Sequence, residues 1–328
     1  MKTDNKAKYA NNLFLIIVLL TLVANIFVSL LSIKKIEINI IANLLLSQMI
    51  ILIPGLIFYV KEKKDDEDFK LYKKIKPLSV ILLVIITWLL MPLVIFANAF
   101  SQLFTTNTVM DASSQLLDHN IVLMVLIIGF FGPFCEEFVF RGLIYKNIRI
   151  QSGRYLLSAL VSAFFFGFMH MNLNQFCYAL VLGIAFAIIS EALDNTWASF
   201  VCHAIVNTQN TIMVYLMNVV MQEIQGMGVS EYYGTMQDAN GGYVDSMKIM
   251  MLVMAIGALI IGVITTALAG LLLYGICSIE GTTDRFKNIF KKKDKPEREK
   301  VVFATGIIAM SICIFVMFLL EPIIEMLK

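Results

Sequence analysis

Five ionisable side chains interrupt otherwise apolar segments of the chain. They are two acids, a base and two imidazoles: Glu136, Glu137, Arg141, His170 and His203. A charged residue at the centre of a membrane helix costs about 2.5–3.5 kcal/mol in free energy of insertion. The presence of such residues therefore indicates a functional site. A carboxylate in apolar surroundings can take a proton from water, and an imidazole with an amide can hold an oxyanion. This set predicts hydrolysis of an amide bond within the membrane.

The two acids differ in their local partners. Glu137 and Arg141 are four residues apart with the acid first, the order that favours an ion pair on a helix. Glu136 lies about 100° further round and has no partner nearby in the sequence. An alternative interpretation is that all three residues anchor the end of a helix.

A later apolar segment carries a polar stripe at spacings of four, seven and eight residues: His203, Asn207, Asn210 and Thr211. Polar groups on one face of a membrane helix must face protein or water. The stripe therefore favours a site over isolated packing histidines.

The depths of these residues decide whether they can meet. Glu137 and His170 lie about equally far from Gly153, in the turn that links their helices, so their depths are similar. His203 is close to the inner end of its helix, whereas His170 is close to an outer turn. Convergence requires the turn at residues 172–174 to lie below the outer surface, or the helices to tilt.

Other intramembrane chemistries lack their sequence signatures. The chain contains no HExxH zinc motif, no GxSxG elbow and no pair of aspartates deep in two spans. Cys135 and Cys202 could act as nucleophiles, but each neighbours a key residue instead of sharing its face. The five cysteines lie in apolar segments without CxxC spacing and are interpreted as buried hydrophobes.

The composition indicates the elements that must position these residues. Of 328 residues, 59% are hydrophobic and 15% charged, which excludes an ordinary cytosolic enzyme, a disordered chain and a nucleic-acid binder. Apolar runs long enough to cross a bilayer predict an all-α bundle of about nine spans in the cell membrane. The spans are expected at 9–33, 38–60, 77–103, 121–140, a hairpin within 155–190, 197–221, 249–278 and 301–320.

Lysines and arginines predict the orientation of the bundle. Of 26 such residues, 22 fall in four segments: 1–8, 61–76, 141–154 and 280–300. The positive-inside rule therefore predicts a cytoplasmic N-terminus and an external C-terminus. The basic loops are suited to lie against anionic lipid.

We expect four parts along the chain. They are a three-helix membrane segment over 1–119, a catalytic helical core over 120–222, an extracytoplasmic loop over 223–247, and a two-helix membrane segment over 248–328 with the basic cytoplasmic loop 280–300. The loop 223–247 contains four acids and no base, so it could be a lid or a polar connector.

Three motifs together resemble a known family. EEFVFR contains Glu136, Glu137 and Arg141, FGFMH contains Phe166 and His170, and HAIVN contains His203 and Asn207. In order and separation they are similar to the EExxxR, FxxxH and HxxxN motifs of the CPBP intramembrane proteases, also called the Abi or type II CAAX prenyl endopeptidase family. Pro133 and Gly142 also fit, and the resemblance covers about residues 120–220.

The resemblance implies a glutamate-dependent endopeptidase whose site opens toward the cytoplasm. Glu136 and His170 would activate water, His203 and Asn207 would form the oxyanion hole, and Glu137 and Arg141 would hold the site together. Because some relatives are described as metalloproteases, Glu136, His170 and His203 are the candidate ligands if zinc is used. We favour a metal-free site, because Asn207 is a natural oxyanion donor and a poor zinc ligand.

The substrate class implied by the family is a membrane-associated or lipidated peptide or protein, prenylated in eukaryotic relatives. Two other functions remain open. One is a non-catalytic immunity or chaperone-type membrane protein that binds a partner in the same polar cavity. The other is a transporter with a proton-relay carboxylate, although no inverted repeat is visible.

Overall fold

The computed structural model describes residues 5–36, 38–65, 71–105, 119–226, 243–290 and 303–320, which form helices and no strand. Each predicted span corresponds to a helix or to consecutive helical segments. In chain order the elements are α1 (Lys6–Ile33), α2 (Ile40–Asp65), α3 (Pro77–Ser101), α5 (Ile121–Met124), η3 (Val125–Phe131), α6 (Gly132–Glu137), η4 (Phe138–Tyr145), α7 (Lys146–Ser152), α8 (Tyr155–Met169), α9 (Leu173–Leu193), α10 (Thr196–Gly226), α12 (Tyr243–Glu280), α13 (Thr283–Phe290), α14 (Ala304–Phe315) and η5 (Val316–Leu320).

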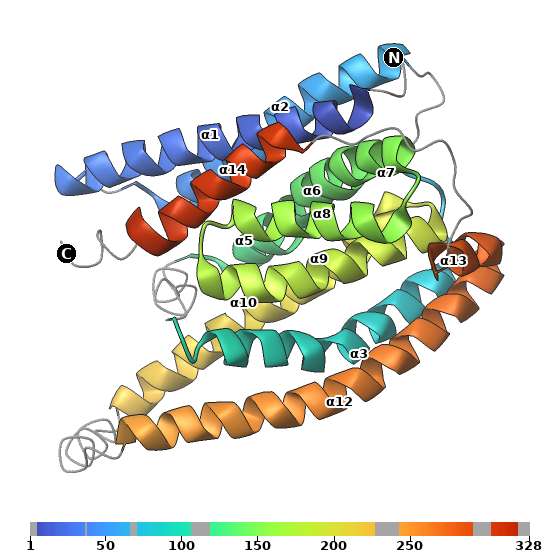
Figure 1. The fold of residues 1–328 in the computed structure, drawn as a ribbon. Helices are drawn as coiled ribbons and strands as arrows, with labels where there is room; N and C mark the ends of the chain where they lie inside the picture. Colours follow the sequence, from blue (N-terminus) through green and yellow to red (C-terminus); the bar gives the residue numbers. More distant parts are fainter. Residues whose placement is uncertain are drawn as a thin grey trace.

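The helices form a layered bundle (Figure 1). The continuous helix from α5 to α7 lies with α8, α9 and α10 in the middle. On one side α1, α2 and α14 cover this middle layer, and on the other side α3 and α12 do so. The residues that resemble the protease family are therefore enclosed by helices from both ends of the chain.

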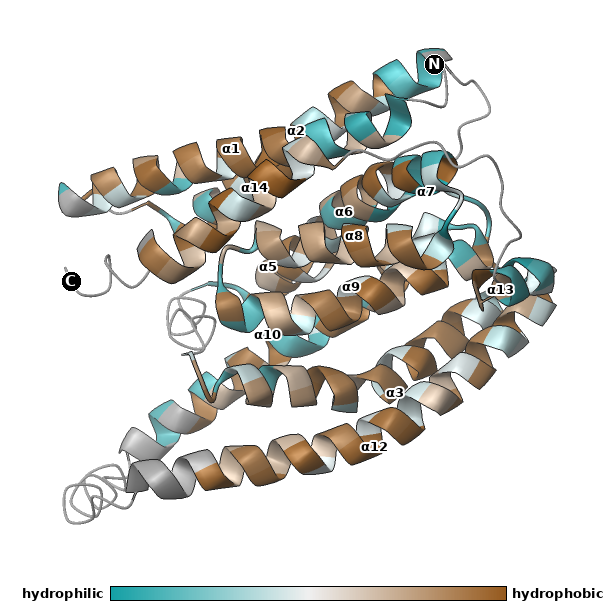
Figure 2. Ribbon diagram, in the orientation of Figure 1, coloured by the Kyte–Doolittle hydropathy of each residue, from teal (hydrophilic) through white to brown (hydrophobic). Residues whose placement is uncertain are grey.

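The outer surface of the bundle is apolar. Large hydrophobic side chains such as Val23, Val263 and Leu271 are more than 60% exposed. Figure 2 shows α12 and α14 hydrophobic over most of their length, with hydrophilic residues gathered near α7 and α13. Six of the described helices are long and apolar enough to cross a membrane, and two shorter apolar helices accompany them. The protein is thus a multi-pass membrane protein.

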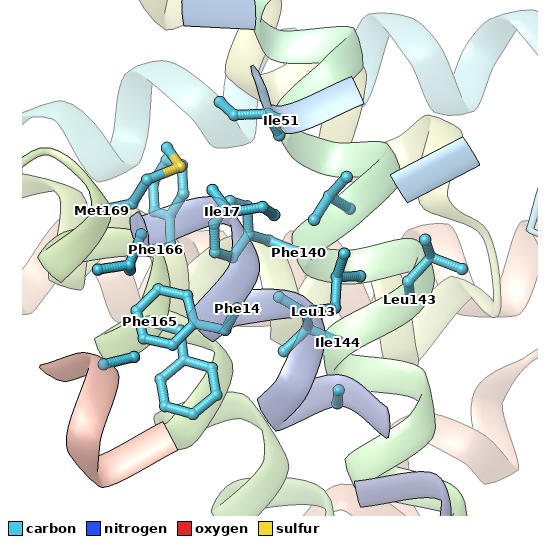
Figure 3. Packing of buried hydrophobic residues seen from close by; sticks show 14 of the residues in the cluster. Leu13, Phe14, Ile17, Ile51, Phe140, Leu143, Ile144, Phe165, Phe166 and Met169 are labelled. Atoms are coloured by element: carbon cyan, nitrogen blue, oxygen red, sulfur yellow. The ribbon is translucent and has the colours of Figure 1, made fainter. Parts of the chain in front are cut away.

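A tightly packed core joins the α1 layer to the middle layer (Figure 3). Phe14 of α1 stacks on Phe165 of α8 with ring centroids 4.1 Å apart. Phe140 of η4 meets Phe166 of α8 edge to face at 5.3 Å. The first contact joins α1 to α8, and the second holds α8 against the helix that carries both acids of the EE motif.

The hairpin predicted within 155–190 consists of a short and a long helix. The 15 residues of α8 measure about 22 Å, which is less than the roughly 30 Å of a bilayer core. The turn follows at once: Met171 has φ 50, and the Asn172 side chain accepts a hydrogen bond from the backbone N–H of Gln175. The short α8 places His170 below the level that a full-length span would reach.

The two ends of the bundle differ in charge. The basic end carries Lys61–Lys64, Lys73–Lys76, Arg149–Arg154 and Arg285–Lys287. The turn end carries the α8–α9 turn, the start of α2, the end of α3 and the start of α5 (Figure 1). At the turn end, Asn174 is buried and donates to Ser101 Oγ at 2.7 Å and to Asn98 Oδ1 at 3.0 Å. These contacts tie α9 to α3.

Three predicted loops are only partly described. The helices α10 and α12 extend into the predicted loop 223–247, whose residues 227–242 lie outside the described residues. The basic loop 280–300 begins with α13, and its residues 291–300 also lie outside the described part, as do residues 66–70 of the segment 61–76. The five cysteines are free thiols, as expected, and four of them are buried.

Candidate active site

The helix that carries the EE motif is widened on both sides of it. The π-helical segments η3 and η4 flank the short α6, which ends at Glu137. Pro133 lies in the first turn of α6 and has no backbone N–H, so it cannot continue the regular ladder to residue 129. Wide turns of this kind occur often at functional sites. Here they occur where two adjacent acids are both buried.

Glu137 is held by a buried ion pair. Its Oε1 lies 2.8 Å from Nη1 of Arg141, and both side chains are at most 1% exposed. The predicted i,i+4 pair is therefore present. Arg141 also donates from Nη2 to the carbonyl of Gly183 at 3.3 Å and lies over the Phe166 ring at 4.4 Å. The guanidinium is fixed by three helices, which fixes Glu137 in turn.

His203 connects the two acids. Its Nδ1 lies 2.9 Å from Oε1 of Glu137, and its Nε2 lies 3.5 Å from Oε2 of Glu136. Since a carboxylate accepts hydrogen bonds, we assign the proton of Nδ1 to the contact with Glu137, which directs Nε2 toward Glu136. The Phe186 ring stacks on the imidazole with centroids 5.0 Å apart.

His170 and His203 both contact one aromatic ring, that of Phe166. The Phe166 ring lies 5.2 Å from His170 and 5.6 Å from His203, both edge to face. The two histidines, separated by 33 positions in the chain, are thus brought into one site. The ionic contact that the structure records for Glu136 is with His203, whereas His170 shares a cavity with Glu136.

The polar stripe of α10 faces the same cavity. Asn207 Nδ2 donates to the carbonyl of Ile128 at 3.2 Å, and Thr211 Oγ1 donates to the carbonyl of Asn207 at 2.8 Å. All four stripe residues line a cavity of about 380 Å³ together with Glu136 and His170. The cavity is large enough for a short peptide segment beside the carboxylate.

Two residues that no motif identifies contact this site. Gln48 of α2 lies within hydrogen-bonding reach of Glu136, although it lies outside the resembling segment. Tyr178 of α9 also lines the cavity. A single glutamine or tyrosine in an apolar run is common, so neither stands out in the sequence.

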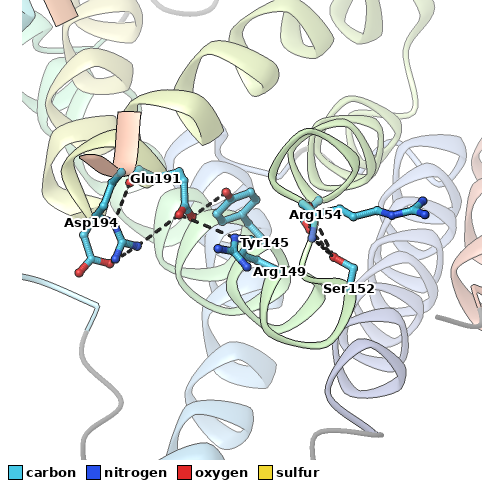
Figure 4. Close-up of polar contacts among 8 residues, drawn as sticks. Tyr145, Arg149, Ser152, Arg154, Glu191 and Asp194 are labelled. Carbon is cyan, nitrogen blue, oxygen red and sulfur yellow. Dashed lines mark hydrogen bonds and ion pairs between the residues drawn. The ribbon is translucent and has the colours of Figure 1, made fainter. Parts of the chain in front are cut away.

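A second polar cluster, centred on the buried Glu191, lies at the basic end (Figure 4). Glu191 accepts a hydrogen bond from the Tyr145 hydroxyl at 2.8 Å and one from Arg285 Nη2 at 3.3 Å. Arg149 approaches the same carboxylate at 3.7 Å, and Arg285 also pairs with Asp194 at 2.8 Å. This cluster joins the end of the EE helix to α9 and α13.

The two candidate cysteine nucleophiles lie apart from this arrangement. Cys135 and Cys202 are fully buried, and Cys202 Sγ contacts the carbonyl of Leu83 at 3.8 Å. Among the described residues that line the cavity, neither thiol is found. They therefore have no access to a bound peptide in this structure.

A zinc ion needs at least three ligand atoms about 2.0–2.3 Å from one point. The 3.5 Å between Glu136 Oε2 and His203 Nε2 is a separation that two zinc ligands can have. Among the described residues, however, no group of three His, Cys, Asp or Glu side chains is arranged to hold a metal ion. The set with His170 as third ligand is not assembled.

Comparison with known proteins gives two matches. The family model for type II CAAX prenyl endopeptidase Rce1-like proteins matches residues 118–209. A protein of Bacillus subtilis (strain 168) named "Putative membrane peptidase YdiL" is 26% identical over 91 residues, which is 28% of this chain and 37% of that protein. The chain thus spans little more than a third of that relative's length. No solved structure matches. The matches confirm the resemblance drawn from the three motifs.

Proposed function

We propose, from the match of residues 118–209 to the type II CAAX prenyl endopeptidase family, that this membrane protein is an intramembrane endopeptidase. One observation carries the proposal: His203 Nε2 lies 3.5 Å from Glu136 Oε2, and both residues line the cavity. A carboxylate, two imidazoles and an amide then surround the space that a peptide bond would occupy.

In the first step, Glu136 acts as general base on a water molecule that His170 helps to orient. Both side chains line the cavity. The water gives its proton to the Glu136 carboxylate, and its oxygen attacks the peptide carbonyl to form a tetrahedral oxyanion. Water activation by a carboxylate needs no metal in this scheme.

In the second step, His203 and Asn207 stabilise the oxyanion. A protonated His203 can donate from Nε2 while Glu137 accepts from Nδ1. Asn207 uses one amide hydrogen on the carbonyl of Ile128, which orients the amide and leaves the second hydrogen for the oxyanion. Glu136 then returns its proton to the leaving amine as the carbon–nitrogen bond breaks.

Glu137 and Arg141 act as positioning residues. Their buried ion pair holds the carboxylate that orients His203. An orienting carboxylate behind a catalytic imidazole fixes both its tautomer and its direction. We propose a membrane-associated or lipidated peptide or protein as substrate, because the site lies among membrane helices.

The test compares peptides in membranes and medium by mass spectrometry between cells with the native chain and cells with Glu136→Gln. The proposal expects one or more cleavage products to disappear while the protein level is unchanged. The matched control is Glu62→Gln, which removes a different buried carboxylate, one paired with Lys6 near the start of α1. Undiminished biological activity in Glu136→Gln would instead favour a non-catalytic partner-binding protein.

A further inference from the structure

The cavity beside Glu136 extends toward one end of the bundle. His170 closes α8 at the α8–α9 turn, and Gln175 lies in the first turn of α9. Ile40 begins α2, again at the turn end. All three line the cavity together with Glu136. The cavity therefore occupies the half of the bundle between Glu136 and the turn end.

The other half of the bundle is closed beneath the catalytic groups. A separate cavity of about 180 Å³ reaches Arg141 from the basic end, with Tyr145, Glu191 and Arg285 in its wall. The two cavities share no lining residue among those described. The buried Glu137–Arg141 pair lies between them, so a substrate at the basic end does not reach Glu136.

The charge distribution assigns the two ends to sides of the membrane. The described basic residues at 61–64, 73–76, 146–154 and 285–287 lie at the basic end, and they belong to the sequence segments that hold 22 of the 26 Lys and Arg residues. The positive-inside rule places this end in the cytoplasm. The turn end, where the catalytic cavity lies, is then extracytoplasmic. This orientation differs from the cytoplasmic opening that the family resemblance implies.

The lining of the cavity indicates what enters it. Glu136 is the one carboxylate among its described lining residues, and none of them is Lys or Arg. The lining also includes aliphatic side chains such as Leu182 and Val206, and neutral amides such as Asn210. Such a lining suits an uncharged, largely apolar peptide segment.

We infer that the site is reached from the extracytoplasmic side and takes an apolar peptide segment of a translocated or outer-leaflet protein. This inference deepens the proposed function and rests on it, because a peptide that enters the cavity is a substrate only if the protein is a peptidase. The side from which the cavity opens is a separate property, which can be measured whether or not cleavage occurs.

The test labels single introduced cysteines in intact cells with a sulfonated maleimide that does not cross membranes. Gln175→Cys reports on the cavity, with Asn210→Cys as a second position should the first variant fold poorly. Ile150→Cys reports on the basic-end cavity and is 38% exposed. Each is made with Cys177→Ser, because Cys177 is a half-buried native thiol.

We expect the cavity cysteines to be labelled in intact cells and Ile150→Cys only after permeabilisation. Labelling of Gln175→Cys should also abolish cleavage of any product lost in Glu136→Gln. Protection of both cavity cysteines in intact cells, or labelling of Ile150→Cys there, would overturn the inference. Normal cleavage in Glu136→Gln would overturn the proposed function. The labelling result would still show from which side of the membrane the cavity opens.

Discussion

Nδ1 of His203 lies 2.9 Å from Oε1 of Glu137, the same oxygen that pairs with Arg141. One carboxylate oxygen thus joins a cavity-lining imidazole to a buried guanidinium, while the other oxygen has no hydrogen-bond partner among the described residues. We therefore expect the orientation of the proposed site and the stability of the fold to depend on the same atom.

The first prediction concerns this shared oxygen. Arg141→Met leaves Glu137 buried without its cation and is expected to destabilise the protein by about 3–5 kcal/mol, as does removal of one partner of other buried pairs. The double variant Glu137→Gln/Arg141→Met removes both charges and should recover part of that loss. Thermal unfolding in detergent measures the stability of the single and the double variant. Additive effects of the two substitutions would show that the pair is not coupled.

Asn207→Ala tests the oxyanion role. Loss of one oxyanion donor typically lowers kcat by about 10²- to 10³-fold, and we expect a loss of this size with little change in KM. Asn218→Ala is the matched control, since Asn218 is on the same helix and its amide donates to the carbonyl of Val214 at 3.0 Å. Equal losses in the two variants would argue against an oxyanion role.

Gln48→Ala tests a positioning role for α2. Gln48 lies close enough to interact with Glu136, so loss of this contact should lower kcat. The loss should be smaller than the roughly tenfold effect of a full hydrogen bond of about 1.5 kcal/mol to a charged group. Gln48→Glu keeps the length of the side chain but cannot donate when ionised, and should not restore activity. Cleavage assays at saturating substrate separate this effect from binding. A native rate in Gln48→Ala would remove Gln48 from the site.

Gly183 is predicted to be sensitive to a single methyl group. An added Cβ would lie 2.9 Å from Cβ of Ala163 and 3.4 Å from Nη2 of Arg141, so Gly183→Ala forces α8 and α9 apart. We expect destabilisation by about 1–3 kcal/mol together with reduced cleavage. Gly257→Ala on α12 meets nothing within 4 Å and should be neutral or slightly stabilising. Similar melting temperatures for both variants would contradict the packing argument.

Removal of metals is expected to leave cleavage intact. The proposed mechanism activates water with Glu136 and uses neutral or cationic hydrogen-bond donors for the oxyanion. Activity after exhaustive chelation, with zinc content measured on the same sample, checks this expectation. Loss of cleavage with recovery on adding zinc would instead assign Glu136, His170 and His203 as ligands.

The sequence predicts the helical segments well for a physical reason. Lipid requires long apolar runs, and charges at their ends mark where helices stop. The hairpin boundary is also predictable, because Asn172 and Asn174 interrupt the uncharged run 155–190 where the short α8 is followed by α9. The sequence alone did not show whether His170 and His203 lie at a similar depth in the membrane. That relationship depends on the short length of α8, which the structure shows.

Contacts of the site between residues close in the sequence can be predicted from the sequence, whereas contacts between residues far apart in it cannot. The Glu137–Arg141 pair follows from helix spacing alone. The contact between Glu136 and His203 joins residues 67 positions apart and depends on how α10 packs on the EE helix. Glu191 follows an uncharged run directly and is indistinguishable in the sequence from an ordinary charge at a helix end.

The short α8 also affects the lipid around the protein. Its exposed residues Leu156, Leu160 and Phe164 belong to a helix that is only about 22 Å long, several ångströms less than the surrounding hydrocarbon is thick. The bilayer adapts to such hydrophobic mismatch by local thinning. The membrane should therefore form a shallow depression beside His170. Such a depression would bring water, which the proposed hydrolysis consumes, and the polar backbone of a peptide closer to the proposed catalytic groups.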